Sequence, residues 1–265
     1  MTHDTKLTTA APLPKPAALE ALAALLPLDA QAPLDVKLER SRHILDTLLA
    51  STGLTPRQMA VAYTGGKDSG VVLHLWRVAL SAAGKGPLRA ISVDTGLKFP
   101  QVTAFRDKHC DDLGVELTLA RPQADIATYP VGQDKLACCG DLKITPLGEA
   151  LRGTKTAVLL VGIRRDEHPS RAGRPYAELR AQTAMTPEYW QVNPILDWTE
   201  MDIWAFITGQ GLPYCELYHQ GYRSLSCMPC TKPCEGCVLG DANERQGRDQ
   251  GKEQQMDALK SLGYF

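Results

Sequence analysis

The chain has 265 residues, of which 44% are hydrophobic, and a formal net charge of −1. Because affinity for a phosphate backbone or an anionic surface depends on clustered Lys and Arg, this charge argues against a general nucleic-acid or membrane-surface binder. No apolar run approaches the ~20 residues of a membrane span and the start lacks the pattern of an export signal, so we expect a cytoplasmic protein with one large α/β domain.

The first 33 residues are rich in Ala, Pro and Thr, and they predict a poorly ordered leader with one short helix over residues 17–26. Apolar residues over 35–49 then follow the period of an amphipathic helix. The leader, residues 1–33, should therefore give way to a folded domain near residue 34.

A glycine turn lies between a short apolar strand and a helix within residues 60–74. The helix should begin near Asp68 and bury Val71, Val72 and Leu75. Bare N–H groups at the glycines and the positive end of the helix dipole suit a polyphosphate. The spacing of the glycines is neither that of a Walker A loop nor that of a dinucleotide fingerprint. The predicted nucleotide contacts are Thr64, Gly65, Gly66, Lys67 and Ser69, and Lys67, Asp68 and Ser69 are predicted to act in catalysis. The alternative is an ordinary glycine turn before a helix.

Strands and helices alternate along most of the chain. Apolar runs predict strands over 88–93, 115–119 and 156–163, and helices that end near 113 and span 142–151. This alternation predicts a doubly wound, mostly parallel sheet flanked by helices, with ligands at the carboxyl ends of the strands. Thr199 should cap a further helix that ends before Gly211.

A polar triplet follows the strand at 88–93. Asp94, Thr95 and Gly96 stand at the end of this strand, where they could hold a ribose, an adenine or a magnesium ion. A plain turn is the alternative for a triplet of this composition. The glycine turn one strand earlier favours the nucleotide role.

Guanidinium groups recur just past the strand at 156–163. Planar groups that are always charged suit sulfate and phosphate oxygens, so the run predicts a clamp for an anionic substrate. Its members are Arg164, Arg165 and Arg171, with Arg174 and Arg180 further along. The alternative is a solvated loop in which Asp166 and Glu167 neutralise the arginines.

Eight cysteines in a chain without an export signal indicate metal or redox chemistry rather than structural disulfides. Six of them cluster as Cys138-Cys139, Cys227-x-x-Cys230 and Cys234-x-x-Cys237. Only three residues separate the two Cys-x-x-Cys pairs, and a zinc ribbon needs about a dozen, so zinc is the lesser interpretation. We predict a [4Fe–4S] cluster, for which six candidates compete for four positions. Unligated cysteines are the alternative.

The chain after about residue 35 resembles the phosphoadenosine-phosphosulfate reductase family of the adenine nucleotide alpha-hydrolase superfamily, whose pyrophosphate loop reads Ser-Gly-Gly-Lys-Asp-Ser. Segments similar to the small, ATP-cleaving subunit of bacterial ATP sulfurylase are 93–99, 164–172, 198–204, 244–248 and 263–265. Segments 138–147 and 221–231 are instead similar to adenylylsulfate reductase. That second similarity implies Cys138, Cys139, Cys227 and Cys230 as the cluster ligands, with Cys234 and Cys237 as alternates.

Two departures decide what the resemblance implies. The reductases carry a nucleophilic cysteine in a Glu-Cys-Gly-Leu-His tail, whereas no cysteine follows Cys237 here. They also tend to lack the loop lysine, since they do not split a triphosphate, whereas this chain keeps Lys67, Asp68 and Ser69. ATP cleavage is therefore implied. The sulfurylase subunit, for its part, ordinarily has no cluster cysteines.

The resemblance and the motifs together predict an enzyme that binds ATP, Mg²⁺ and a [4Fe–4S] cluster and releases pyrophosphate. Sulfate is the preferred acceptor, and the resemblance then implies a GTPase large subunit as partner. Three alternatives stay open: an ATP-dependent Fe–S sulfurtransferase acting on a nucleic acid or a small molecule, a reductase of adenylylsulfate or phosphoadenylylsulfate with Cys234 or Cys237 as nucleophile, and a non-catalytic nucleotide and Fe–S sensor. The predicted division is a leader over 1–33, a nucleotide-binding domain over 34–210 and a cysteine-rich segment over 211–265; a homodimer is left open.

Overall fold

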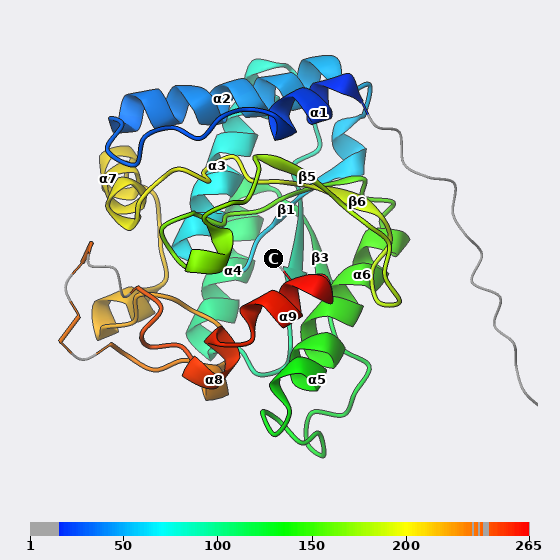
Figure 1. Cartoon of the computed structure of the whole chain (residues 1–265), viewed down its shortest axis with the longest axis vertical. Helices are drawn as coiled ribbons and strands as arrows, with labels where there is room; N and C mark the ends of the chain where they lie inside the picture. Colours follow the sequence, from blue (N-terminus) through cyan, green and yellow to red (C-terminus); the bar gives the residue numbers. More distant parts are fainter. Residues whose placement is uncertain (1–15, 235, 238, 241–243, 265) are drawn as a thin grey trace, which may run out of the picture.

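A computed structural model of the chain describes residues 16–234, 236–237, 239–240 and 244–264. Within these residues a six-stranded sheet forms the centre of the fold, in the order β3-β2-β1-β4-β6-β5 (Figure 1). The strands are β1 (Met59–Ala62), β2 (Arg89–Val93), β3 (Glu116–Ala120), β4 (Val158–Leu160), β5 (Ala177–Arg180) and β6 (Tyr189–Val192). Only β5 runs antiparallel to its described neighbour, so the predicted doubly wound, mostly parallel sheet is confirmed.

Helices surround the sheet. The longer ones are α2 (Leu34–Ser51), α3 (Lys67–Ala82), α4 (Pro100–Leu113), α6 (Thr145–Gly153) and α7 (Glu200–Gln210). The shorter ones are α1 (Ala17–Ala23), α5 (Lys135–Cys139), α8 (Gln250–Glu253) and α9 (Met256–Ser261), and the π-helix η2 (Gly140–Ile144) joins α5 to α6. The 3₁₀ turns are η1 (Pro56–Gln58), η3 (Pro169–Arg171), η4 (Glu216–Gln220) and η5 (Met228–Cys230). None of the helices described is long and apolar enough to cross a membrane.

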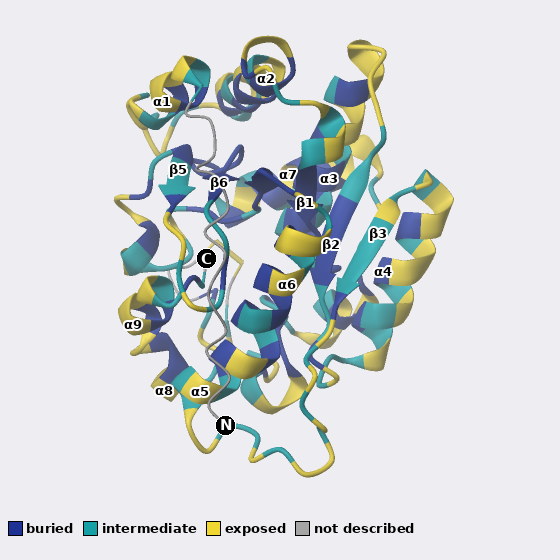
Figure 2. Cartoon of the chain, turned by 90° about the vertical axis from the view of Figure 1, so that its right-hand side faces the viewer, coloured by how far each residue is buried: buried dark blue, intermediate teal, exposed yellow. Residues whose placement is uncertain are grey.

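The connections place helices on both faces of the sheet. β1, β2 and β3 are neighbours joined by α3 and α4, so right-handed crossovers put these two helices on one face. The chain then returns past β1 to β4 through α6, which packs against β2 and β3 on the other face (Figure 2). The central strands are thereby covered on both sides.

The core is centred on β1 and β4, whose residues are all buried. Parallel strands covered on both faces read as continuous apolar runs, which is why β4 lies within the apolar run 156–163. α3 buries Val71, Val72 and Leu75, as the sequence predicted. The predicted cap is also confirmed, because the Thr199 side chain accepts from the backbone at the start of α7.

Part of the predicted leader is folded. Leu19 and Leu22 of α1 are 0% and 2% exposed, and α1 packs against α2 and β5. The expected leader therefore does not extend through residues 16–33, because apolar side chains on one face of α1 find a buried surface. The helix also ends at Ala23, short of the predicted 26, and residues 1–15 lie outside the described part of the chain.

The sequence predicted neither β5 nor β6, and it predicted no element after residue 211, where α8 and α9 occur. α8 and α9 have four and six residues, which is too short to show a period. Long-range contacts hold them instead: Arg180 at the end of β5 donates Nη2 to the carbonyl oxygen of Lys260 in α9, at 2.8 Å. The C-terminal segment is thereby fastened beside the sheet.

Candidate active site

The phosphate loop, residues Thr64–Ser69, joins β1 to α3. Gly65 has φ of +79°, and a Cβ there would lie 3.0 Å from the carbonyl oxygen of Val102, so both the backbone and α4 require glycine. Ser69 Oγ donates to the carbonyl oxygen of Gly66 at 3.0 Å and accepts from the Thr64 N–H at 3.3 Å. The turn is thus held from within at the N-terminus of α3, a geometry that favours an anion.

The loop lysine is buried among its partners. Lys67 Nζ lies 3.1 Å from Asp68 Oδ2 and forms an ion pair with Glu244. It also donates to the carbonyl oxygen of Arg223 at 3.1 Å. Burial alone would lower the pKa of Lys67, but the carboxylates of Asp68 and Glu244 outweigh burial and raise it. Burial likewise would raise the pKa of Glu244, but Lys67 and Arg164 lower it to about 2, so both partners stay charged.

Arg164, which follows β4, is fully buried behind this pair. Its Nε lies 2.8 Å from Asp68 Oδ1, and its Nη1 lies 3.0 Å from Asp166 Oδ2. It also forms an ion pair with Glu244. Asp68 and Glu244 therefore connect Arg164 to Lys67.

A cleft opens between the phosphate loop, the residues after β4 and the C-terminal segment. The first group of lining residues is Thr64, Gly66, Asp68, Ser69, Gly162, Glu167 and Arg171. The second group is Lys98, Lys143, Ser224, Ser226, Arg245, Arg248 and Tyr264. The cleft therefore joins the phosphate loop to a basic region. We call the basic residues of the second group, Lys98, Lys143, Arg245 and Arg248, the cationic group.

Positive charge is concentrated in the cationic group. Lys143 Nζ donates to Ser226 Oγ at 3.2 Å, and Arg248 Nη2 donates to Ser224 Oγ at 2.7 Å. Burial, with Lys143 and Arg248 nearby, lowers the pKa of Lys98 to about 8, and burial with a neighbouring arginine lowers the pKa of Arg248. A lowered pKa means that these cations are under-compensated: too little negative charge lies nearby to offset their burial. This part of the cleft therefore favours an anion.

The four cysteines implied by the resemblance come from α5 and from η5 with its preceding residue, which tertiary contacts bring together. Lys135 of α5 forms an ion pair of 2.7 Å with Asp249, whose N–H donates to the carbonyl oxygen of Cys230 at 3.1 Å. Tyr264, Cys227 and Cys139 together raise the pKa of Lys143 against the effect of burial, so its ammonium interacts with cysteines of both segments.

The thiols themselves suit a cluster. Cys227 Sγ lies 3.3 Å from Thr95 Oγ1, and Lys143 and Lys98 outweigh burial to lower the pKa of this thiol to about 7. The free thiols of this region are Cys138, Cys139, Cys227 and Cys230, whereas Cys234 and Cys237 are joined as a disulfide. Thiolates beside lysines fit a [4Fe–4S] centre, which is held by four thiolates and gains charge compensation from nearby cations.

Three carboxylates offer a site for Mg²⁺. Asp68, Glu167 and Glu244 each present an oxygen within 4.8 Å of the others. Carboxylate oxygens are among the ligands that Mg²⁺ prefers, so the donor set fits the ion. The same side chains pair with lysine and arginine in this structure, and a bound cation would compete with those pairs.

Seven of the predicted nucleotide-binding or catalytic residues lie outside the described cleft lining: Gly65, Lys67, Asp94, Thr95, Gly96, Arg164 and Arg165. Asp94 faces two arginines at 3.7 Å each, and Thr95 contacts Cys227. Arg165 Nε lies 2.7 Å from Asp197 Oδ1. The nucleotide role of the triplet and the clamp role of Arg165 stay predictions, since the side chains of Asp94, Thr95 and Arg165 contact other residues in this structure. Arg174 and Arg180 likewise pair with Glu178.

Sequence reasoning missed several cleft residues, namely Lys98, Lys143, Tyr218, Arg245, Arg248 and Tyr264. All except Tyr218 lie in segments noted for their family resemblance, which was the signal that could have found them. Tyr218 carried no such signal, although its hydroxyl accepts from the Lys67 N–H at 2.9 Å. Phe265, the last residue of the motif at 263–265, lies outside the described residues.

The fold and the cleft define a doubly wound α/β protein with a phosphate loop at the carboxyl end of a central parallel strand. Residues 58–233 match the phosphoadenosine phosphosulfate reductase domain, and the chain belongs to that family. The family places it among the nucleotide-related enzymes of sulfur metabolism.

Relatives within this family carry two different activities in their names. The chain is 28% identical to the adenosine 5'-phosphosulfate reductase of Agrobacterium fabrum, over 77% of this chain and 80% of that one. It is 29% identical to the sulfate adenylyltransferase subunit 2 of Methylorubrum populi, over 77% of this chain and 87% of that one. The relatives therefore leave the particular reaction to be argued from the site.

Solved structures share the fold. The FMN adenylyltransferase of Candida glabrata in complex with FMN and an ATP analogue has a TM-score of 0.62 at 16% identity, covering 93% of this chain and 90% of that one. A U34-tRNA thiolase of Methanococcus maripaludis with its [4Fe–4S] cluster has a TM-score of 0.52 at 16% identity, covering 89% and 80%. At this identity the likeness concerns the fold alone.

Proposed function

We propose that the protein cleaves ATP, transfers the adenylyl group to sulfate and releases pyrophosphate. The observation that carries this proposal is the shared cleft, which is lined by the phosphate loop and by the cationic group. A nucleotide and a small oxyanion can therefore bind side by side. The named sulfate adenylyltransferase relative supports the same reaction.

The triphosphate would lie on the phosphate loop at the N-terminus of α3. Lys67 is paired with Glu244 in this structure, so the carboxylate must move before the ammonium can contact a phosphate. Mg²⁺ bound by Asp68, Glu167 and Glu244 would neutralise part of the triphosphate charge. Binding of the metal would draw Glu244 away from Lys67.

In the reaction, a sulfate oxygen attacks the α-phosphorus in line. The new phosphorus–oxygen bond forms as the bond to the β-phosphate oxygen breaks, and the electron pair leaves with pyrophosphate. Sulfate is already an oxyanion, so no general base is needed. Catalysis then depends on alignment and on neutralising the charge that develops on pyrophosphate. Arg171 lines the cleft, Lys67 would contribute once Glu244 moves away, and Arg164 holds the loop.

The acceptor would bind in the cationic group. Lys98 and Arg248 supply under-compensated charge there, and Lys143 donates to the Ser226 hydroxyl beside them. Charge-assisted hydrogen bonds of this kind are about twice as strong as neutral ones, which suits a small dianion. The proposal therefore separates a nucleotide half of the cleft from an oxyanion half.

The cysteines favour a second candidate function. Cys138, Cys139, Cys227 and Cys230 would hold a [4Fe–4S] cluster next to the cationic group, and such a cluster can supply electrons or sulfur. In the second candidate, adenylylation activates an oxygen of a nucleic acid or small molecule for replacement by sulfur.

The named adenosine 5'-phosphosulfate reductase relative supports a third, reductive function, with Cys234 or Cys237 as nucleophile. A nucleotide and Fe–S sensor is the non-catalytic alternative.

By relation to a sulfate adenylyltransferase subunit 2, we also infer a large-subunit partner, a GTPase in this proposal, and a cytoplasmic location. Co-purification of the two chains would test the partner. The division at residue 211 likewise stays a proposal.

An anaerobic assay of pyrophosphate release tests the function. Protein with four iron per chain is given MgATP, with and without sulfate, and sulfate should stimulate release of pyrophosphate while molybdate yields AMP. Absence of stimulation would sink sulfate activation. Stimulation by a thiolation substrate would support the second candidate, sulfite from adenylylsulfate with a dithiol reductant would support the reductase, and tight ATP binding without any turnover would support the sensor.

A further inference from the structure

Cys234 and Cys237 are a reactive pair that sulfate activation leaves unused. Their Cα atoms lie 5.6 Å apart and their sulfurs are joined, within the ~4.4–6.8 Å that a disulfide spans. Both residues are half-buried, so another molecule can reach them. They are distinct from the four free cysteines that fit the cluster.

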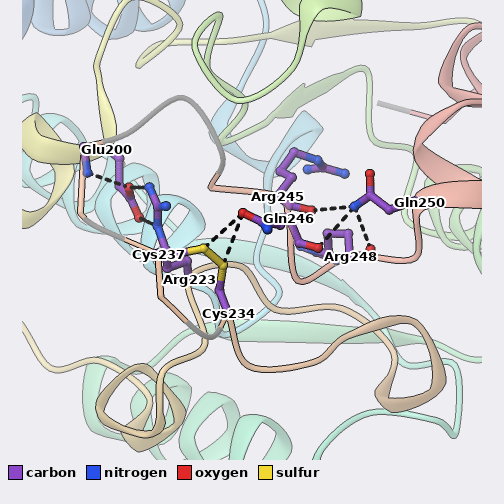
Figure 3. Close-up of a disulfide and its surroundings, with 9 residues drawn as sticks. Glu200, Arg223, Cys234, Cys237, Arg245, Gln246, Arg248 and Gln250 are labelled. Carbon is purple, nitrogen blue, oxygen red and sulfur yellow. Dashed lines mark hydrogen bonds and ion pairs between the residues drawn. A yellow bond between two sulfur atoms is a disulfide. The ribbon is translucent and has the colours of Figure 1, made fainter.

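Both sulfurs lie next to the side chain of Gln246 (Figure 3). Its Oε1 lies 3.8 Å from Cys234 Sγ and 3.3 Å from Cys237 Sγ. A thiol donates a weak hydrogen bond to such an oxygen, whereas a disulfide has no proton to donate. The surroundings therefore suit the dithiol as well as the disulfide, and reduction gives the two sulfurs a hydrogen-bond acceptor.

Gln246 belongs to a segment that reaches the cleft. Two residues before it, Glu244 pairs with Lys67, and two residues after it, Arg248 lines the cleft. The next residue, Gly247, accepts at its carbonyl from the Lys232 N–H at 2.8 Å. A Cβ at Gly247 would lie 2.3 Å from the carbonyl oxygen of Lys232, so the backbone before Cys234 and the backbone after Gln246 are in direct contact.

A second set of contacts joins the cysteine pair to Lys67. Gly240, three residues after Cys237, donates its N–H to Glu200 Oε2 at 3.4 Å. Glu200 forms an ion pair with Arg223, drawn in Figure 3, and the carbonyl of Arg223 accepts from Lys67 Nζ. Glu244 and the Arg223 carbonyl, two partners of the Lys67 ammonium, thus belong to segments that contact residues flanking the cysteine pair.

We propose that Cys234 and Cys237 form a redox-active site that exchanges two electrons with an external dithiol protein, and that the disulfide holds Glu244 on Lys67. In reduction, a thiolate of the dithiol protein attacks one sulfur and breaks the S–S bond, which forms a mixed disulfide. The second thiol of that protein then releases it as its own disulfide, leaving Cys234 and Cys237 as two thiols. A disulfide oxidant reverses the exchange. This proposal goes beyond adenylyl transfer, because the exchange needs no nucleotide.

Thiol trapping on the holoenzyme tests the exchange. Protein with its cluster is equilibrated anaerobically in mixtures of reduced and oxidised dithiothreitol and quenched with an alkylating reagent, and the peptide with residues 234–237 is analysed by mass spectrometry. We expect reversible conversion between a disulfide and a doubly alkylated peptide, with four iron per chain throughout. Cys237→Ser should leave a single alkylated thiol. Its Cys234 thiolate should also attack the disulfide of an oxidised thioredoxin-type protein, which forms a mixed disulfide and releases one thiol of that protein, and rapid alkylation of the released thiol traps the mixed disulfide. Cys110→Ser, a change in the core, is the matched control and should exchange normally.

A peptide that stays in one state across the whole range would overturn the proposal, as would loss of iron in Cys234→Ser or Cys237→Ser. We call the second part of the proposal, that the disulfide holds Glu244 on Lys67, the closing role. It is measured separately, as the affinity for a non-hydrolysable ATP analogue. The reduced holoenzyme should bind it about tenfold more tightly than the oxidised form, or about 1.4 kcal/mol, and this difference should vanish in Cys234→Ser. Equal affinities would overturn the closing role. Failure of sulfate to stimulate pyrophosphate release leaves both measurements unaffected, so the two proposals fail separately.

Discussion

Lys67 in the phosphate loop and Glu244 near the C-terminus form a buried ion pair across 177 residues of sequence. The same carboxylate pairs with Arg164 after β4, so one side chain connects the loop, the sheet and the C-terminal segment. A buried pair stabilises the fold only while both members are present. The C-terminal segment is therefore part of the nucleotide site, and its pair with Lys67 must open before a phosphate can take its place.

Replacing Glu244 with Gln should lower the free energy of unfolding by about 3 kcal/mol, because Lys67 and Arg164 stay buried with less compensation. Urea denaturation at neutral pH measures this change. Glu149→Gln, at an exposed position, is the matched control and should change stability by less than about 0.5 kcal/mol. Equal stability of Glu244→Gln and the wild type would contradict the role of the pair.

The free energy of unfolding should depend on pH through the ionisation of Glu244. The pKa of Glu244 is lowered from 4.5 to about 2 in the folded protein, so its contribution is fully present above pH 4.5 and is lost as the pH falls towards 2. Between these values the wild type should lose more stability than Glu244→Gln, as followed by thermal unfolding. Parallel pH profiles would show that Glu244 is not paired in solution.

Replacing Lys67 with Met should reduce pyrophosphate release by roughly 10²–10³-fold, the cost of removing one preorganised charge from a transition state. The apolar stem is kept, so circular dichroism should show a folded protein. Lys108→Ala, whose side chain is exposed on α4, is the control and should keep full activity. Undiminished ATP cleavage in Lys67→Met would refute the assignment of the phosphate loop.

Replacing Gly162 with Ala should destabilise the protein by about 1–3 kcal/mol, the usual cost of overpacking. A Cβ at Gly162 would lie 2.9 Å from the Asp68 carbonyl carbon and 2.9 Å from the Ser69 nitrogen. Backbone atoms cannot turn aside as a side chain can, so the phosphate loop should shift and ATP affinity should fall. Gly173→Ala has open space and is the control. Calorimetry and nucleotide titration measure both effects, and identical values for the two variants would contradict the prediction.

Replacing Cys227 with Ser should abolish the iron–sulfur cluster, because a hydroxyl does not replace a thiolate ligand at the site that Lys143 faces. Anaerobic iron and sulfide analysis, together with the loss of brown colour, measures this. Cys215→Ser changes a buried cysteine outside the cluster set and should keep its iron. A colourless, zinc-loaded wild-type protein would rule the cluster out.

Local features of the fold followed from the sequence, because they depend on neighbours within a few residues. Apolar periodicity specified α2 and α3 and the buried run around β4, and the alternation of strands and helices specified a mostly parallel sheet. The glycine turn could be recognised because Gly65 needs a positive φ and a close approach to α4. The family followed from motifs distributed along the chain, which the match over residues 58–233 bears out.

The meeting of distant side chains was decided by tertiary structure alone. Nothing local shows that Glu244 reaches Lys67 or that Arg165 turns to Asp197, since each orientation depends on a partner far away in sequence. The cationic group has the same origin, because its lysines and arginines come from separate segments that converge at one cleft. Spacing predicts which elements form, but the direction of a long charged side chain is set by the charges that the fold brings within its reach.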